Sequence, residues 1–237
     1  MNWLDKLGDW GDVLSPYLTS SQFDMLTDDI KRDVPKGVYP AGKDCFKAFK
    51  LCQLENLRVV ILGQDPYHNG QATGLAFGVE STPIPPSLKI ITRELRAQFD
   101  HVPEEFDFSL EHWAAQGVLL LNTALSVVKG QPGSHSHLWS WLTPMIINEM
   151  CTCKKDLIFV LWGKHAQKYE VYIHNTKHIL KSPHPAAEAY SGGKAGFFGN
   201  GHFLKVNELV SPKIDWFELP VKATEEEQIK LIEREAK

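Results

Sequence analysis

The sequence lacks the features that several broad classes of protein require. No apolar run approaches the length of a membrane span. The first residues, MNWLDKLGDWGDV, have neither the basic region nor the apolar core of a secretory signal peptide. The formal net charge of −4 gives no overall attraction to nucleic acid, so DNA binding would need a local surface. We therefore expect a cytoplasmic protein with no membrane partner.

Cysteine is scarce and poorly spaced for a metal centre. The four cysteines are Cys45, Cys52, Cys151 and Cys153. Only one residue separates Cys151 from Cys153, which is tighter than the usual two-residue gap of zinc and iron–sulfur sites, and the other pair has no matching spacing. This mismatch favours ordinary reduced cysteines, and we expect neither a metal nor a cofactor.

Two common catalytic signatures are also missing. A serine hydrolase would need a G-x-S-x-G elbow, and a nucleotide-binding P-loop would need G-x-x-x-x-G-K-[ST]. Neither pattern occurs in the chain. A third class stays open, a hydrolase in which an acid manages a water while a separate donor stabilises a departing anion.

The residues that are present predict one large α/β domain over residues 1–237. Short runs rich in Val, Ile and Leu lack clean alternation, which is typical of strands buried on both faces of a parallel sheet. These runs lie at 58–62, 118–122, 157–162 and 178–181, and helix-like stretches at 87–99, 141–150 and 164–173 separate them. The alternation predicts a three-layer sandwich with a central, mostly parallel, four-stranded twisted sheet flanked by helices.

The C-terminal residues 224–237 form a separate, charged pattern. Thr224 and Glu227 have the spacing of a capping box, which predicts a helix over this segment. A solvated terminal helix is the simpler interpretation, and a partner surface is the alternative.

Polar residues follow each predicted strand. Asp65, Asn122, Gly163 and the segment 182–184 all stand at or just beyond a strand end. In open parallel sheets ligands bind beyond the carboxyl ends of the strands, so these residues should converge. A lone Asp or His there is more often structural, but two on different strands beside an Asn and aromatic residues favour a catalytic site.

The loop after the first of these strands carries a recognisable motif. Gly63-Gln64-Asp65-Pro66-Tyr67-His68, followed by GQA at 70–72 and GLAF at 74–77, resembles the water-activating motif of the main uracil-DNA glycosylase family. One such motif could arise by chance, but several in the family's order are specific. The others are PIPPSL at 83–88, QGVLLLN at 116–122, LWG at 161–163, SPHP at 182–185, GFFG at 196–199 and IDW at 214–216.

The resemblance implies an activity and a set of roles. The reaction would be hydrolysis of the N-glycosidic bond between uracil and deoxyribose in DNA, which leaves an abasic site and initiates base excision repair. Asp65 would orient the attacking water and stabilise the cationic sugar, and His184 would donate a hydrogen bond to uracil O2. In the base pocket, Asn122 would read the Watson–Crick edge, Tyr67 would exclude the methyl group of thymine, Phe77 would stack on the ring, and Gln64 would bind through its backbone.

The resemblance also implies DNA contacts through short loops. The expected substrate is uracil-containing DNA, single- or double-stranded, bound by a monomer, and a DNA-mimicking protein inhibitor is a candidate partner. The pattern S-H-x-x-x-G-W is not kept around 134–141, so which histidine there approaches DNA stays open. The candidate DNA-binding residues are His68, Ser87, Ser134, Ala186, Tyr190 and Lys194.

The chain departs from the family after His184. The usual H-P-S-P-L-S, whose leucine fills the space left by the flipped base, is replaced by a longer HPAAEAYSGGKA at 184–195. The adjacent glycines Gly192 and Gly193 predict a more flexible loop. Our hypothesis is that Tyr190 takes over as the wedge while Lys194 contacts a phosphate. The alternative is that Tyr190 only packs the loop.

Two other functions are compatible with parts of this pattern. A catalytically weak protein that binds uracil in DNA would fit the altered loop, but the intact Asp65 and His184 argue against it. A related glycosylase of broader base specificity is opposed by Tyr67 and Asn122 together. No lysine stands in a position suited to Schiff-base chemistry, so strand cleavage is not expected.

Overall fold

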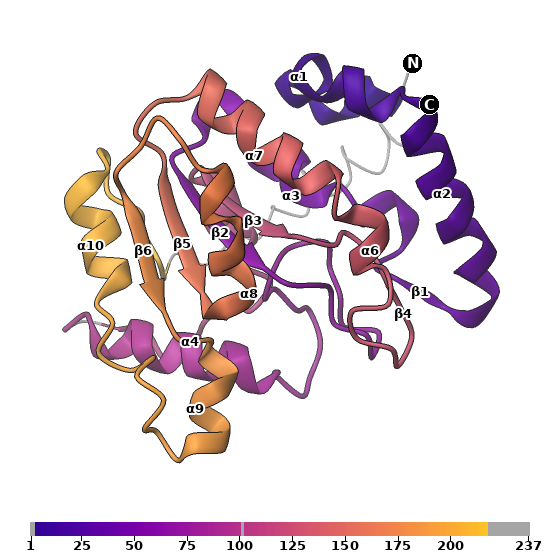
Figure 1. The fold of residues 1–237 in the computed structure, drawn as a ribbon. Helices are drawn as coiled ribbons and strands as arrows, with labels where there is room; N and C mark the ends of the chain where they lie inside the picture. Colours follow the sequence, from indigo (N-terminus) through magenta and orange to yellow (C-terminus); the bar gives the residue numbers. More distant parts are fainter. Residues whose placement is uncertain (1–2, 101, 218–237) are drawn as a thin grey trace, which may run out of the picture.

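A parallel four-stranded sheet forms the centre of the molecule. The structure is a computed structural model that describes residues 3–100 and 102–217, and its ribbon is drawn in Figure 1. The strand order is β3-β2-β5-β6, and every neighbouring pair is parallel. The strands are β2 (Val59–Gly63), β3 (Val118–Asn122), β5 (Ile158–Trp162) and β6 (Ile179–Ser182). The predicted α/β fold class is confirmed, and each predicted strand differs from the observed one by at most one residue at either end.

The register aligns the ends of the strands at one edge. Gly63 pairs with Asn122, and Trp162 pairs with Ser182. Every residue of β2, β3 and β5 is buried, as expected for strands covered on both faces. The residues that follow the strands therefore meet at one edge, where the arrowheads of β5 and β6 point in Figure 1.

Helices flank this sheet (Figure 1). The predicted helix at 87–99 is α4, and the one at 141–150 is α7. The predicted helix at 164–173 is α-helical only in its first part, α8, and continues as the 3-10 helix η5, a common tightening at a helix end. Their bounds are Pro86–Ala97 for α4, Leu142–Cys153 for α7, Gly163–Gln167 for α8 and Lys168–Tyr172 for η5.

The remaining elements surround this centre. A second, antiparallel pair joins β1 (Val38–Tyr39) to β4 (Val127–Val128). The other α-helices are α1 (Asp9–Leu18), α2 (Ser21–Asp33), α3 (Lys47–Leu51), α5 (Glu111–Ala115), α6 (Ser136–Trp139), α9 (Pro185–Ser191) and α10 (His202–Leu209). The helix predicted at 224–237 lies outside the described residues.

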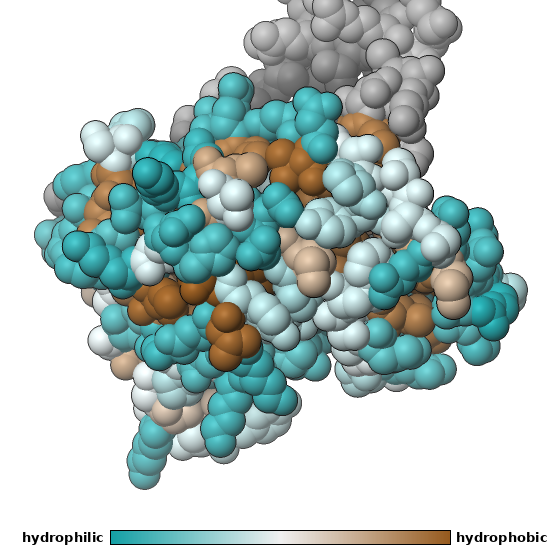
Figure 2. All heavy atoms as spheres, turned by 45° about the horizontal axis from the view of Figure 1, so that its top comes forward, coloured by the Kyte–Doolittle hydropathy of each residue, from teal (hydrophilic) through white to brown (hydrophobic). Residues whose placement is uncertain are grey.

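Aromatic side chains fill much of the core beside the sheet. Trp113, Phe203 and Trp216 pack edge to face, with ring centroids 5.0–5.7 Å apart, and Trp162 of β5 joins them. The face drawn in Figure 2 is mostly hydrophilic, with hydrophobic residues in small separate patches. Within residues 3–100 and 102–217, no helix is long and apolar enough to cross a membrane.

Candidate active site

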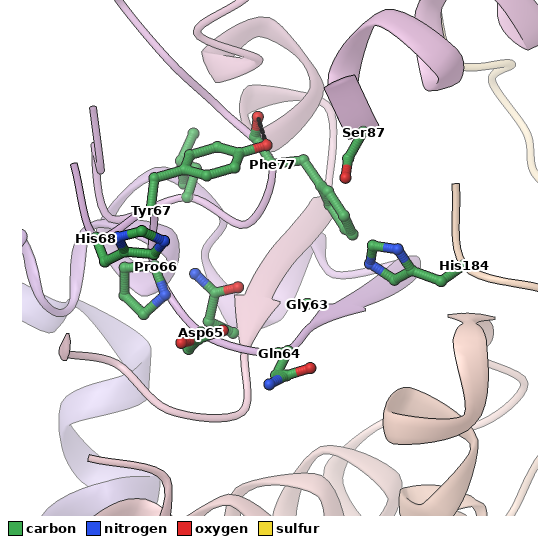
Figure 3. Close-up of a pocket in the computed structure, with 11 residues that line it drawn as sticks. Gly63, Gln64, Asp65, Pro66, Tyr67, His68, Phe77, Ser87 and His184 are labelled. Carbon is green, nitrogen blue, oxygen red and sulfur yellow. Dashed lines mark hydrogen bonds between the residues drawn. The ribbon is translucent and has the colours of Figure 1, made fainter. Parts of the chain in front are cut away.

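A small pocket opens where the central strands end. Its volume is about 170 Å³, well below the several hundred Å³ typical of sites for drug-sized ligands, so it suits a single ring. In Figure 3, Tyr67 and His184 stand on opposite sides with Phe77 between them, while Asp65 and Gln64 lie at the lower side. The lining residues are Gly63, Gln64, Asp65, Pro66, Tyr67, His68, Leu75, Phe77, Ser87, Asn122 and His184.

Gly63 allows the side chain of Asn122 to enter the pocket wall. The two residues are partners in the β2–β3 register, and Asn122 is 6% exposed. A Cβ on residue 63 would lie 2.2 Å from Asn122 Oδ1 and 2.9 Å from the Cβ of Ala76. Any larger residue at the end of β2 would therefore displace the amide, which explains the glycine that opens the motif.

Two backbone amides and one side-chain hydroxyl of neighbouring loops hold the motif after β2. The carbonyl of Gln64 accepts hydrogen bonds from Ala124 N at 3.0 Å and from Thr123 Oγ1 at 2.8 Å. The carbonyl of His68 accepts from Gly130 N at 2.9 Å. The loop is thus anchored at both ends, and its side chains are directed by a fixed backbone.

The carboxylate of Asp65 is oriented by a residue far away in the sequence. Gly133 N donates to Asp65 Oδ2 at 2.6 Å. A carboxylate has room for about four hydrogen bonds, so this contact leaves acceptor capacity for a water. Gly133 lies between β4 and α6, in a loop whose role the sequence does not reveal.

Tyr67 and Phe77 form an apolar wall. Burial raises the pKa of the Tyr67 phenol, so the ring stays neutral. Its hydroxyl donates to the carbonyl of Phe77 at 3.4 Å. The Phe77 ring lies 5.6 Å from that of Trp162 and 6.1 Å from that of His184, between centroids. Phe77 has a φ of 67°, an unusual backbone angle for a large residue, which turns its ring toward the pocket.

His184 is held in one tautomer by the helix that it caps. Its Nδ1 accepts a hydrogen bond from Ala186 N at 3.1 Å, so this nitrogen carries no proton and Nε2 carries it. Burial, together with the nearby His165, lowers the pKa of His184 and favours the neutral ring. A Cβ on residue 163 would lie 2.7 Å from the Cβ of His184, so Gly163 makes room for this ring.

The predicted base-pocket and catalytic residues thus all line one pocket. Of the predicted DNA-binding residues, some line the pocket and others lie outside it. His68 and Ser87 line the pocket. Ser134 stands beside Gly133 and accepts from Val128 N at 2.8 Å, which shapes the loop that holds Asp65. Ala186 contacts His184 through its backbone. Tyr190 and Lys194 lie on the surface outside the pocket, and Tyr190 is 89% exposed.

The segment that we expected to be a loop at 186–195 is largely ordered by hydrogen bonds. Its first part belongs to helix α9, which begins at Pro185 and ends at Ser191. Gly192 has a φ of 62°, the left-handed conformation that commonly ends a helix. The glycine pair therefore follows a short helix as a turn, and its greater flexibility remains a prediction. Sequence patterns missed the helix because α9 is only 7 residues long.

The cysteines do not assemble into a metal site. All four are free thiols. Burial raises the pKa of Cys45 to about 11 and that of Cys52 to about 12, so both thiols stay protonated at neutral pH. Within the described residues, no group of three or more His, Cys, Asp or Glu side chains is arranged to hold a metal ion.

Comparisons with known proteins match this arrangement. The family model of the uracil DNA glycosylase superfamily matches residues 49–210. The chain belongs to the uracil DNA glycosylase superfamily. This confirms the family predicted from the GQDPYH motif, and the matched region includes every residue of the pocket.

Individual relatives extend the match over most of the chain. A uracil-DNA glycosylase of Amoebophilus asiaticus is 44% identical and covers 84% of this chain and 90% of its own length. Uracil-DNA glycosylase 1 of Listeria innocua is 46% identical and covers 76% and 83%. Among solved structures, a mimivirus UNG variant in complex with UGI is 27% identical, covers 91% of both chains and has a TM-score of 0.78.

Proposed function

We propose that this superfamily member is a uracil-DNA glycosylase that hydrolyses the N-glycosidic bond of deoxyuridine and releases free uracil. The class of enzyme follows from the family and from relatives that bear this name. The finer mechanism rests on one observation, that a fixed carboxylate and a neutral imidazole face one small pocket. The predicted single domain, the monomeric state and the cytoplasmic location remain predictions.

Asp65 acts on the sugar side of the bond. As the bond breaks, positive charge develops on the deoxyribose, and a nearby carboxylate stabilises it. The same carboxylate accepts a hydrogen bond from the attacking water and directs its oxygen at C1′. The bond from Gly133 N to Asp65 holds the carboxylate in place for both tasks. The water oxygen forms the new bond to the sugar, and its proton leaves by way of the carboxylate.

His184 acts on the base side. The bonding electrons pass to uracil, which leaves as an anion with negative charge on O2. Because Nδ1 accepts from Ala186 N, the Nε2–H of the neutral ring is the donor for that oxygen. A neutral donor stabilises the anion without giving up its proton, so uracil departs as the anion.

Three side chains select the base. The Asn122 amide can accept from uracil N3–H and donate to O4, whereas cytosine presents the opposite pattern. The half-buried Tyr67 ring occupies the space that the C5 methyl of thymine would need, and the Phe77 ring stacks on the base. Gln64 contributes its backbone at the base of the pocket.

Uracil must leave the helix to enter this pocket, because the pocket is too small for paired bases. We propose that the exposed Tyr190 fills the space left in the duplex and that Lys194 contacts a phosphate. His68, Ser87, Ser134 and Ala186 are the remaining proposed DNA contacts. A mimivirus relative forms a complex with UGI, which supports the proposal that this chain also binds a protein inhibitor that mimics DNA.

Release of free uracil tests the proposal directly. Uracil-containing single-stranded and duplex DNA are incubated with the protein in the presence of a chelator, with Asp65→Asn as the matched variant. We expect uracil release by the unmodified chain and a loss of roughly three orders of magnitude in the variant. Tight binding of uracil-DNA without release would instead identify a binding protein, and loss of activity on chelation would point to a metal-dependent reaction.

A further inference from the structure

Glu188 is a buried acid that the catalytic scheme does not use. It lies on α9, is 2% exposed, and its carboxylate is surrounded by backbone N–H groups. Oε1 accepts from Phe198 N at 3.2 Å and from Phe197 N, and Oε2 accepts from Ala195 N at 3.0 Å. Burial raises the pKa of Glu188, but the hydrogen bonds from these donors together lower it by more. The pKa is therefore below its ordinary value, and the carboxylate stays ionised.

These contacts close the chain between residues 188 and 198 into a ring. Gly193 N donates to the backbone carbonyl of Glu188 at 3.1 Å, and Lys194 N donates to Ser191 Oγ at 3.1 Å. Ser191 Oγ in turn lies 3.3 Å from Glu188 Oε2. Tyr190 and Lys194 are exposed on the outer side of this ring, so one buried carboxylate fixes the backbone that presents both side chains.

A second buried acid continues the same pattern. Glu94 of α4 is 2% exposed and accepts from Gly199 N at 2.8 Å. The backbone of 195–199 is thus held by a carboxylate from α9 and another from α4, two helices that lie side by side in Figure 1. Between them Phe197 is fully buried against Trp162, whose ring also contacts Phe77 in the pocket wall. The segment 195–199 is therefore connected to the base pocket through these packed aromatic rings.

We propose that Glu188 is a positioning residue for duplex opening, which it supports by holding the ring of residues 188–198 in one conformation before DNA binds. This inference rests on the proposed function. A loop that is ordered in advance loses less conformational entropy on binding, so its side chains act on DNA at lower cost. Single-stranded DNA needs no base pair opened, so the effect should be specific to duplex substrate.

The test compares duplex and single-stranded substrate in one set of variants. kcat/KM for uracil release is measured on a uracil-containing strand, alone and annealed to its complement. In Glu188→Gln, an amide NH2 replaces one carboxylate oxygen and faces backbone N–H donors that it cannot accept from. We therefore expect kcat/KM to fall roughly tenfold on duplex DNA and to change by less than about twofold on single-stranded DNA. The matched control is Glu208→Gln, on the exposed end of α10, which should change neither value.

A milder variant guards against misfolding. Ser191→Ala removes the acceptor of Lys194 N and leaves Glu188 in place, so we expect a smaller loss, again only on duplex DNA. Amide hydrogen exchange of Ala195, Phe197 and Phe198 provides a readout independent of activity. These amides should exchange roughly tenfold faster in Glu188→Gln, as expected when one buried hydrogen bond is lost.

Each outcome decides the inference. A duplex-specific loss with faster exchange supports the positioning role. Equal losses on both substrates, or no loss on either, overturn it. If the unmodified chain releases no uracil, the proposed function fails and the role of Glu188 in duplex opening fails with it. Faster amide exchange in Glu188→Gln would still show that Glu188 holds residues 195–198.

Discussion

Two segments meet at the pocket and are stabilised in different ways. The motif 63–68 at the end of β2 is held by backbone amides and one hydroxyl of neighbouring loops, and its residues line the cavity. The segment 184–199 after β6 is held mainly by two buried carboxylates, and Tyr190 and Lys194 point outward. From this difference we propose a division of labour, in which the loop 63–68 together with His184 carries out the chemistry and residues 185–199 open the DNA duplex.

His184 lies in the second segment but takes part in both tasks. Its ring lines the pocket, while its Nδ1 caps α9 by accepting from Ala186 N. The same hydrogen bond therefore sets the tautomer that the chemistry needs and fixes the start of the helix that leads to Tyr190. A variant at this position should affect both tasks, which makes it a sensitive probe of the division.

The largest effect is expected for Asp65→Asn. The amide keeps the size of the side chain but removes the charge that stabilises the cationic sugar, so the single-turnover rate should fall roughly 10³-fold. Because the loss is chemical, it should be equal on single-stranded and duplex DNA. A loss confined to duplex DNA would contradict the assignment of Asp65 to the chemical step.

His184→Leu should come next. Loss of the Nε2–H donor should lower the single-turnover rate on single-stranded DNA roughly 10²-fold. Loss of the cap on α9 should add a further decrease on duplex DNA only. Rates on both substrates, measured beside those of wild type, check this, and identical losses on the two substrates would contradict the second role.

Tyr190→Ala should have a smaller and selective effect. Removal of an aromatic side chain that stacks on exposed bases costs about 1–3 kcal/mol, so duplex kcat/KM should fall roughly tenfold. Uracil release from single-stranded DNA should stay the same. Tyr190→Phe, which keeps the aromatic ring, serves as the control and should retain the activity on duplex DNA. Unchanged duplex activity in Tyr190→Ala would remove the wedge assignment.

The smallest effect concerns pH. The pKa of His184 is lowered by burial and by His165, so its neutral form persists below the pH at which an ordinary histidine becomes charged. A histidine with the usual pKa of about 6.5 is half protonated at pH 6.5, whereas less than half of His184 should be protonated at that pH. The single-strand rate should therefore decline only at lower pH. The same sign applies to stability, which should fall as the pH drops through the lowered pKa.

Local sequence patterns predicted the central strands and the positions of the residues that follow them. The strands at 118–122 and 58–62 were visible because fully buried parallel strands are continuous apolar runs. The convergence of Asp65 and Asn122 followed from the rule that the carboxyl ends of parallel strands share one edge. The roles proposed for them came from the family motif and not from periodicity.

What could not be predicted depends on contacts between distant residues. Gly133 holds Asp65 across 68 positions, and Glu94 holds Gly199 across 105. Nothing in the sequence near Glu188 distinguishes it from a solvated surface acid, because its burial is created by the chain that folds over it. The only local signal was negative, the loss of the usual motif after His184.

The most direct test of the division of labour is the ratio of duplex to single-strand kcat/KM, measured side by side in Asp65→Asn and Tyr190→Ala. We predict that Asp65→Asn lowers both values and leaves the ratio unchanged, while Tyr190→Ala lowers the ratio roughly tenfold. If the two variants change the ratio to the same extent, the separation of chemistry from duplex opening is contradicted.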